Sequence, residues 1–254
     1  MCLFFYNKTP RLLHFLCIIS VKASKIGSEF VAAFGEYIAI LGLDHMLYMI
    51  GLIMIGTALF IKRDKVVDNK KVVTLIILMA SILQQIILYG SYFHFMAFDL
   101  AESLPFHISR VSSILGIIYL ITKNSKVFKV VSFFGLFAWT SFLYPSRVHG
   151  VLHPIGISFF INHLVTLLLP FYGMIAYGEV IQKGDKKSVF PWFLLYLAVA
   201  MCVNWLVDGN YFYLKHKPVL SSLSDVIYIP LLILFAYIIF SIGEWAYTRV
   251  SKRF

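Results

Sequence analysis

Long apolar runs alternate with short polar connections along the chain from about residue 36 to the C-terminal region. Seven of these runs are about 20 residues long, the length that an α-helix needs to cross a bilayer core of about 30 Å. They cover residues 36–61, 72–93, 104–122, 127–144, 156–178, 189–207 and 226–247. The pattern therefore predicts an all-α polytopic membrane protein, built as a bundle of about seven transmembrane helices.

The first 33 residues do not fit this pattern. Their segment RLLHFLCIISVK holds only about ten apolar residues, which is too short to cross a bilayer. No A-x-A cleavage site follows it, so it is either a weak signal-like segment or an interfacial helix. Residues 1–33 are thus expected to form an N-terminal extension. Residues 34–254 are expected to form one seven-helix transmembrane domain, because their connections are short.

Composition agrees with a membrane protein. Hydrophobic residues make up 60% of the chain and charged residues 13%, and the mean hydropathy is +0.85. Soluble proteins have about 45–50% apolar and about 25% charged residues. The three cysteines (Cys2, Cys17 and Cys202) show neither metal-ligand spacing nor a disulfide framework, and no cofactor is expected.

The net charge of +10 is distributed unevenly. Fourteen of the 22 Lys and Arg residues follow the first, third, fifth and seventh runs, whereas the loops after the even runs hold only Arg147, Lys215 and Lys217. The positive-inside rule places the basic side in the cytoplasm, so we expect the N-terminus outside and the C-terminus inside. The charge reflects membrane insertion, and no nucleic-acid partner is expected.

Amide and ionisable side chains gather in the halves of the runs that this topology places toward the outside. They are Asp44, His45, Gln84, Gln85, His107, Arg110, Asn162, His163, Asn204 and Asp208, and the hydroxyl of Ser103 accompanies them. The inner halves hold little beyond Glu179 and Glu244. Because ionisable groups that face lipid are costly, they are expected to converge on the bundle interior. The sequence therefore predicts an outward-opening polar pocket.

Spacing within single runs refines this pocket. Ser103, His107 and Arg110 are spaced i, i+4 and i+7, which places them on one helix face if Pro105 occupies the first turn. Structural readings stay open for each candidate. Arg110 can snorkel to headgroups, His163 and Asn204 can join helices by hydrogen bonds, and Asp208 can be a solvated helix end. His149 and His153 have the spacing of a helical metal pair, but Gly150 and Pro154 disfavour a helix there, so no metal is expected.

Four segments carry a resemblance to a known family: LGLDHMLYMIG, LPFHISR, FFINHLVTLLLP and DGNYFYLKHKPVLSSLSD. From about residue 34 to 248 the chain resembles the YwaF-like family of integral membrane proteins, which includes a eukaryotic branch of transmembrane acyltransferases. The resemblance implies seven helices and, for the eukaryotic branch, acyl transfer between phospholipids through a cysteine in a Pro-Cys-His sequence. Here that position is Phe106, and the position where many bacterial relatives have a cysteine is Ser109. His107 and His163 match the family pattern, but the cysteine mechanism does not carry over.

The first hypothesis is an enzyme that acts on an acyl or headgroup bond of a membrane phospholipid at the outer leaflet. Its candidate catalytic residues are His107 or His163 as general base, Asp208 as an orienting carboxylate and Ser103 as a hydroxyl. Its candidate binding residues are Arg110, Gln85, Asn204, His45, Lys215 and Lys217. One alternative is a proton-coupled transporter of a small solute, but the near absence of polar residues in the inner halves of the runs argues against a path through the membrane. The other alternative is a non-catalytic lipid-binding protein. The resemblance to bacterial proteins points to a bacterial plasma membrane.

Overall fold

The computed structural model of this chain describes residues 37–95, 97–217 and 220–253. The N-terminal extension expected for residues 1–33, with Cys2 and Cys17, lies outside the described residues. Every regular element in the described part is helical, as the sequence predicts. The helices are α2 (Leu43–Ile61), α3 (Arg63–Asp68), α4 (Lys70–Phe95), α5 (Leu100–Ser103), α6 (Ile108–Thr122), α7 (Ser125–Phe134), α8 (Leu136–Leu143), α9 (Pro154–Tyr177), α10 (Asp185–Val207), the 3-10 turn η2 (Tyr211–Tyr213) and α11 (Asp225–Ser251).

Six helical segments of the described part are long and apolar enough to cross a membrane. They are α2, α4, the combined α7 and α8 (Ser125–Leu143), α9, α10 and α11. The remaining expected span, residues 104–122, corresponds to α6, which has 15 residues and is therefore about 22 Å long. The count of seven spans thus stays a prediction, whereas the multi-pass helical architecture is confirmed.

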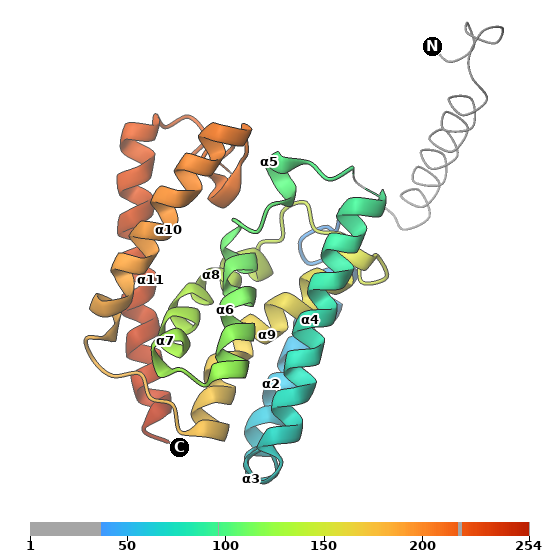
Figure 1. Cartoon of the computed structure of the whole chain (residues 1–254), viewed down its shortest axis with the longest axis vertical. Helices are drawn as coiled ribbons and strands as arrows, with labels where there is room; N and C mark the ends of the chain where they lie inside the picture. The colour runs from blue at the N-terminus through green and yellow to red at the C-terminus, as the bar shows by residue number, and fades with distance from the viewer. Residues whose placement is uncertain (1–36, 96, 218–219, 254) are drawn as a thin grey trace, which may run out of the picture.

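Helix α9 lies at the centre of the bundle, where it contacts α2, α3, α4, α6, α7 and α8 (Figure 1). The α10–α11 pair packs against α7 and α8 on one flank. Aromatic rings pack against one another where the α10–α11 pair meets α7 and α8. The ring centroid of Phe193 lies 5.4 Å from that of Phe137, 5.8 Å from that of Phe212 and 5.7 Å from that of Phe240. Helices in lipid associate through such close packing, because lipid tails are as apolar as the side chains.

The two ends of the bundle differ in charge. One end, here called the basic end, carries α3, the α6–α7 and α9–α10 connections and the C-terminus, and it holds the 14 Lys and Arg residues counted above (Figure 1). The opposite end carries α5, η2 and the starts of α6, α9 and α11. Because this opposite end also holds a cavity of about 590 Å³, we call it the cavity end.

Candidate functional site

The chain breaks between α5 and α6, at the point where a continuous helix was expected. Leu104 is extended (φ −66°, ψ 157°), and His107 is again extended (φ −66°, ψ 136°) as the N-cap of α6. Pro105 explains the break, because its ring disfavours the helical conformation of the residue before it. The prediction that Ser103, His107 and Arg110 share one helix face is therefore wrong.

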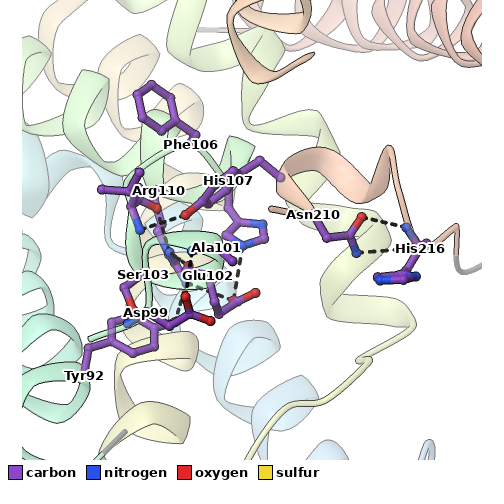
Figure 2. A network of polar contacts seen from close by, with 12 residues as sticks. Tyr92, Asp99, Ala101, Glu102, Ser103, Phe106, His107, Arg110, Asn210 and His216 are labelled. Atoms are coloured by element: carbon purple, nitrogen blue, oxygen red, sulfur yellow. Dashed lines mark hydrogen bonds and ion pairs between the residues drawn. The ribbon is translucent and has the colours of Figure 1, made fainter. Parts of the chain in front are cut away.

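Arg110 holds this break together. Its Nη1 atom donates to the backbone oxygens of Glu102 at 2.5 Å and Leu104 at 2.8 Å. Its Nη2 atom donates to the hydroxyl of Tyr92 and lies 3.4 Å from Oε1 of Glu102 (Figure 2). Only 7% of Arg110 is exposed. The guanidinium thus uses most of its donors within the protein, which leaves few of them for a ligand.

Glu102 pairs with His107 across the same break. Its Oε1 atom lies 3.2 Å from Nε2 of His107, although the two groups are not aligned for a full hydrogen bond (Figure 2). Burial alone would raise the pKa of the Glu102 carboxyl, but the contact with His107 and the charge of Arg110 bring it below its ordinary value. The His107 ring also packs edge-on against Tyr211, with centroids 4.9 Å apart. Glu102 is therefore an anionic partner that the sequence analysis missed.

A cavity of about 590 Å³ opens beside this pair. It lies between the C-terminal ends of α4 and α8 and the N-terminal ends of α6, α9 and α11. Its polar lining includes Gln84, Glu102, His107, Arg147, His149 and His163. Its apolar lining includes Leu88, Phe137, Phe159, Leu231, Leu232 and Phe235. A ligand with a polar group and a hydrocarbon chain suits this division.

His163 lines the cavity, and one of its ring nitrogens is an unused acceptor. Its Nδ1 atom lies 2.8 Å from the backbone oxygen of Phe159, which can only accept, so Nδ1 carries the proton. In the neutral ring Nε2 is then a bare acceptor. This atom is buried and has no hydrogen-bond partner within the described residues. Since an unsatisfied buried acceptor costs about 1–3 kcal/mol, the arrangement favours a ligand that donates to Nε2.

The connection between α8 and α9 supplies two further lining residues. Arg147 (φ 55°) is exposed and makes no hydrogen bond or ion pair in the described part of the chain. His149 stacks on His153 with centroids 3.9 Å apart. Burial lowers the pKa of both imidazoles, that of His153 to about 4, where the charge of His149 adds to the effect. The residues 146–153 are not helical, as Gly150 indicated, and no cluster of three metal-ligand side chains occurs among the described residues.

Two of the expected binding residues, His45 and Asn204, have structural partners instead. The backbone N–H of Leu41 donates to Nδ1 of His45, whose Nε2 lies 2.9 Å from the backbone oxygen of Phe142. The amide of Asn204 makes two hydrogen bonds to the backbone of Tyr211, of 2.9 Å and 2.7 Å. Both side chains therefore fix connections next to the cavity and do not line it.

Gln85 and Ser103 also lie outside the cavity lining. The Nε2 atom of Gln85 donates to the hydroxyl of Ser113 at 2.9 Å, so it joins α4 to α6. The buried hydroxyl of Ser103 accepts from the backbone N–H of Asp99 at 3.2 Å. Gln84, which precedes Gln85 in the sequence, does line the cavity.

The charged candidates near η2 are held in ion pairs. Nζ of Lys215 lies 2.5 Å from Oδ1 of Asp208, and this hydrogen bond and the charge of Lys215 lower the pKa of the Asp208 carboxyl. Nζ of Lys217 lies 2.7 Å from Oδ1 of Asp225. None of these four side chains lines the cavity, so Asp208 is not placed to orient either histidine.

The position that the family resemblance assigns to a cysteine is filled by an aromatic ring. Phe106 packs edge-on against Tyr211, with centroids 5.8 Å apart, and its backbone oxygen accepts from the hydroxyl of Tyr196 at 2.9 Å. Cys202 is exposed on α10. No cysteine of the described part lines the cavity, whereas Ser109, in the first turn of α6, does.

The comparisons with known proteins agree with a membrane protein. An uncharacterized protein of Treponema pallidum (strain Nichols) is 26% identical over 119 residues, a match that covers 46% of this chain and 49% of that relative, about half of its length. No solved structure matches. The resemblance noted in the sequence is confirmed at the level of a transmembrane family, whereas the narrower YwaF-like assignment stays a prediction. The model of the TMEM164 family matches residues 40–244, and the chain, a multi-pass membrane protein, belongs to that family.

Proposed function

We propose that the chain binds a membrane phospholipid in its cavity and hydrolyses or transfers one of the lipid's ester-linked groups. One observation carries this proposal: the Glu102–His107 pair lies at the wall of a cavity whose lining combines ionisable groups with aliphatic and aromatic side chains. A phospholipid offers a partner for both, in its headgroup and in its acyl chains.

His107 serves as the general base. The carboxylate of Glu102 favours the tautomer with the proton on Nε2, which leaves Nδ1 free to accept a proton. Nδ1 makes no hydrogen bond within the described residues. It takes the proton from a water, a lipid hydroxyl or Ser109, and the oxygen attacks the ester carbonyl carbon. The departing alkoxide then recovers that proton from Nδ1.

Arg147 is the better candidate for the lipid phosphate. Arg110 is already engaged by Glu102, Leu104 and Tyr92, so it positions the catalytic pair. Arg147 lines the cavity without such partners, and its guanidinium can bind a phosphate with two hydrogen bonds. The roles first expected for Lys215 and Lys217 would require both to leave their carboxylate partners.

We further propose that the chain crosses the membrane seven times, with the basic end in the cytoplasm and the N-terminus outside, in a bacterial plasma membrane. The uneven distribution of Lys and Arg supports the orientation. The connectivity supports the count, because α6 returns from the cavity end, where α4 stops, to the basic end, where α7 begins. The lipid then enters from the outer leaflet.

A second candidate is lipid binding without turnover. Phe106 favours it, because a phenyl ring stands at the position of the nucleophilic cysteine of the acyl-transfer branch. In that case the unsatisfied Nε2 of His163 and the charge of Arg147 retain a lipid, and no bond is broken.

The test is mass spectrometry of lipids after incubation of the purified, full-length protein in vesicles of mixed phospholipids. We expect one phospholipid class to lose or exchange an acyl chain with the wild type, and turnover to fall at least about 100-fold in His107→Ala, the low end for loss of a general base. Glu102→Gln should lower turnover less, with a shifted pH profile. His216→Ala, a matched change of an exposed histidine outside the cavity, should change nothing.

The variants separate the candidates. Loss of turnover in Ser109→Ala would identify a serine nucleophile, whereas full activity would indicate direct attack by water or a lipid hydroxyl. If a lipid copurifies with the wild type but its composition never changes, the chain binds lipid without catalysis. If no lipid copurifies and none is altered, the lipid proposal fails and transport of a small solute becomes the leading alternative.

A further inference from the structure

A second recess, about 490 Å³ in volume, lies at the basic end and shares no lining residue with the first cavity. It forms where the α9–α10 connection meets the last turns of α11. Lys183 lines it from the connection, and Trp245 and Lys252 line it from the last turns of α11. None of these residues has a role in the proposed reaction.

The charge of this recess is positive where it is open. Its carboxylate, Glu244, is buried, and its Oε1 atom accepts from the backbone N–H groups of Gly184 at 2.8 Å and Lys186 at 3.0 Å. That charge is therefore compensated at the start of α10. Lys183 and Lys252 are exposed, and neither makes an ion pair within the described part of the chain. Two ammonium groups thus remain for an anion.

An apolar stripe leads away from the recess along α11. Ile238, Ile242 and Trp245 are spaced i, i+4 and i+7, which is one helix face, and they are 47%, 59% and 56% exposed. Arg249 stacks over the Trp245 ring, with its guanidinium carbon 3.9 Å from the centroid. Tryptophan and arginine at the end of an apolar helix face are typical of the membrane–water interface. The recess is therefore at headgroup depth, and the stripe is at acyl-chain depth.

We propose that this recess is a binding site for an anionic phospholipid, with Lys183 and Lys252 on the phosphate and one acyl chain along Ile238 and Ile242. The site is independent of the lipid substrate proposed for the first cavity, because the two lie at opposite ends of the bundle. The charge of the two lysines selects an acidic headgroup, and the stripe selects a lipid over a soluble phosphate ester.

Trp245 makes the site measurable by fluorescence. In the full chain, Trp139, Trp192 and Trp205 are replaced by Phe, so that Trp245 is the one tryptophan left of the four. The variant is reconstituted in phosphatidylcholine vesicles that contain a few mole per cent of phosphatidylglycerol with brominated acyl chains, which quench nearby tryptophan. We expect stronger quenching than with the same amount of brominated phosphatidylcholine, by roughly five-fold per lysine in apparent affinity.

Two double variants test the contribution of the lysines. Lys183→Gln with Lys252→Gln should remove the preference for phosphatidylglycerol while the far-ultraviolet spectrum stays unchanged. Lys126→Gln with Lys187→Gln removes the same charge from exposed positions at the basic end outside the recess, and it should leave the preference intact.

Three results would overturn the proposal. Equal quenching by the two brominated lipids would mean that the recess does not select an anion. A preference that survives the Lys183→Gln and Lys252→Gln changes, or that falls equally in the control pair, would assign it to general surface charge. Loss of the preference on addition of glycerol 3-phosphate would identify a soluble phosphate ester as the ligand in place of a lipid.

Discussion

At the basic end, the hydroxyl of Thr74 lies 2.6 Å from the hydroxyl of Tyr172 and 2.5 Å from that of Tyr177, and it donates to the backbone oxygen of Lys70. At the cavity end, by contrast, the Nε2 atom of His163 is buried with no partner in the described part. Bonded polar groups stabilise a bundle, whereas an unbonded acceptor costs about 1–3 kcal/mol. The hydroxyl of Tyr119, toward the basic end, is also buried without a partner in the described part, but Tyr119 does not line the cavity, whereas His163 does. We infer that the position of His163 gives up stability for binding.

Substitutions of two arginines at the cavity end should give the largest difference in stability. Arg110→Ala should lower the free energy of unfolding by about 1–3 kcal/mol for each of the two backbone oxygens, of Glu102 and Leu104, that lose their buried donor. Arg147→Ala, its matched control, should unfold like the wild type but retain less copurified lipid. Thermal unfolding in detergent and lipid analysis of the purified proteins measure both effects. A stable Arg110→Ala variant that has lost its lipid would instead restore Arg110 as the phosphate ligand.

A pair of histidines sharpens the comparison further. Both ring nitrogens of His45 have backbone partners, so His45→Leu should lower the free energy of unfolding by about 1–3 kcal/mol. His163→Leu removes an acceptor that lacks a partner and only one hydrogen bond, from Nδ1 to the backbone oxygen of Phe159, so its stability should fall less than that of His45→Leu while lipid binding falls. Melting temperatures measure the stability of the two variants, and the amount of copurified lipid measures their binding. Equal destabilisation by the two changes would show that His163 is a structural residue like His45.

The helices and the location of the cavity follow from local sequence patterns. Apolar runs of the length of a bilayer identified six spans, and depth along those runs predicted that His107, Arg110 and His163 would gather at one end, where all three line the cavity. This works because the cost of a polar group in lipid depends on its own position alone.

Hydrogen bonds between segments that lie far apart in the sequence could not be predicted from such patterns. His45 looked like a binding residue, but its acceptor on Phe142 is 97 residues away, and no local signal announces it. Glu102 was missed for a different reason. A residue before proline avoids the helical conformation, and applying this rule to Leu104 would have predicted the break that brings Glu102 to His107.

Close packing at the basic end provides a smaller test that should not affect the cavity. A Cβ atom on Gly173 would lie 2.5 Å from Cε2 of Phe128 and 2.9 Å from the hydroxyl of Tyr119, so Gly173→Ala should lower the free energy of unfolding by about 1–3 kcal/mol. Gly90→Ala, on the open surface of α4, should raise it by about 0.5–1 kcal/mol. Lipid selectivity should stay unchanged in both. An altered lipid profile in Gly173→Ala would mean that the two ends are coupled.

The smallest change in stability is expected for a substitution of Asp208, which the sequence pattern suggested as a carboxylate that orients a catalytic histidine. Its side chain is 88% exposed, and the hydrogen bond and charge of Lys215 lower its pKa. A carboxyl with a lowered pKa contributes stability above its unfolded value of about 4, and that contribution is lost as the pH falls through the lower folded value. Because exposed ion pairs contribute little, Asp208→Asn should lower the melting temperature barely measurably at pH 7 and not at all near pH 2. Turnover should keep its pH profile in this variant, since Glu102 and not Asp208 contacts His107. A shifted pH profile for turnover would return Asp208 to the catalytic site and remove the assignment made to Glu102.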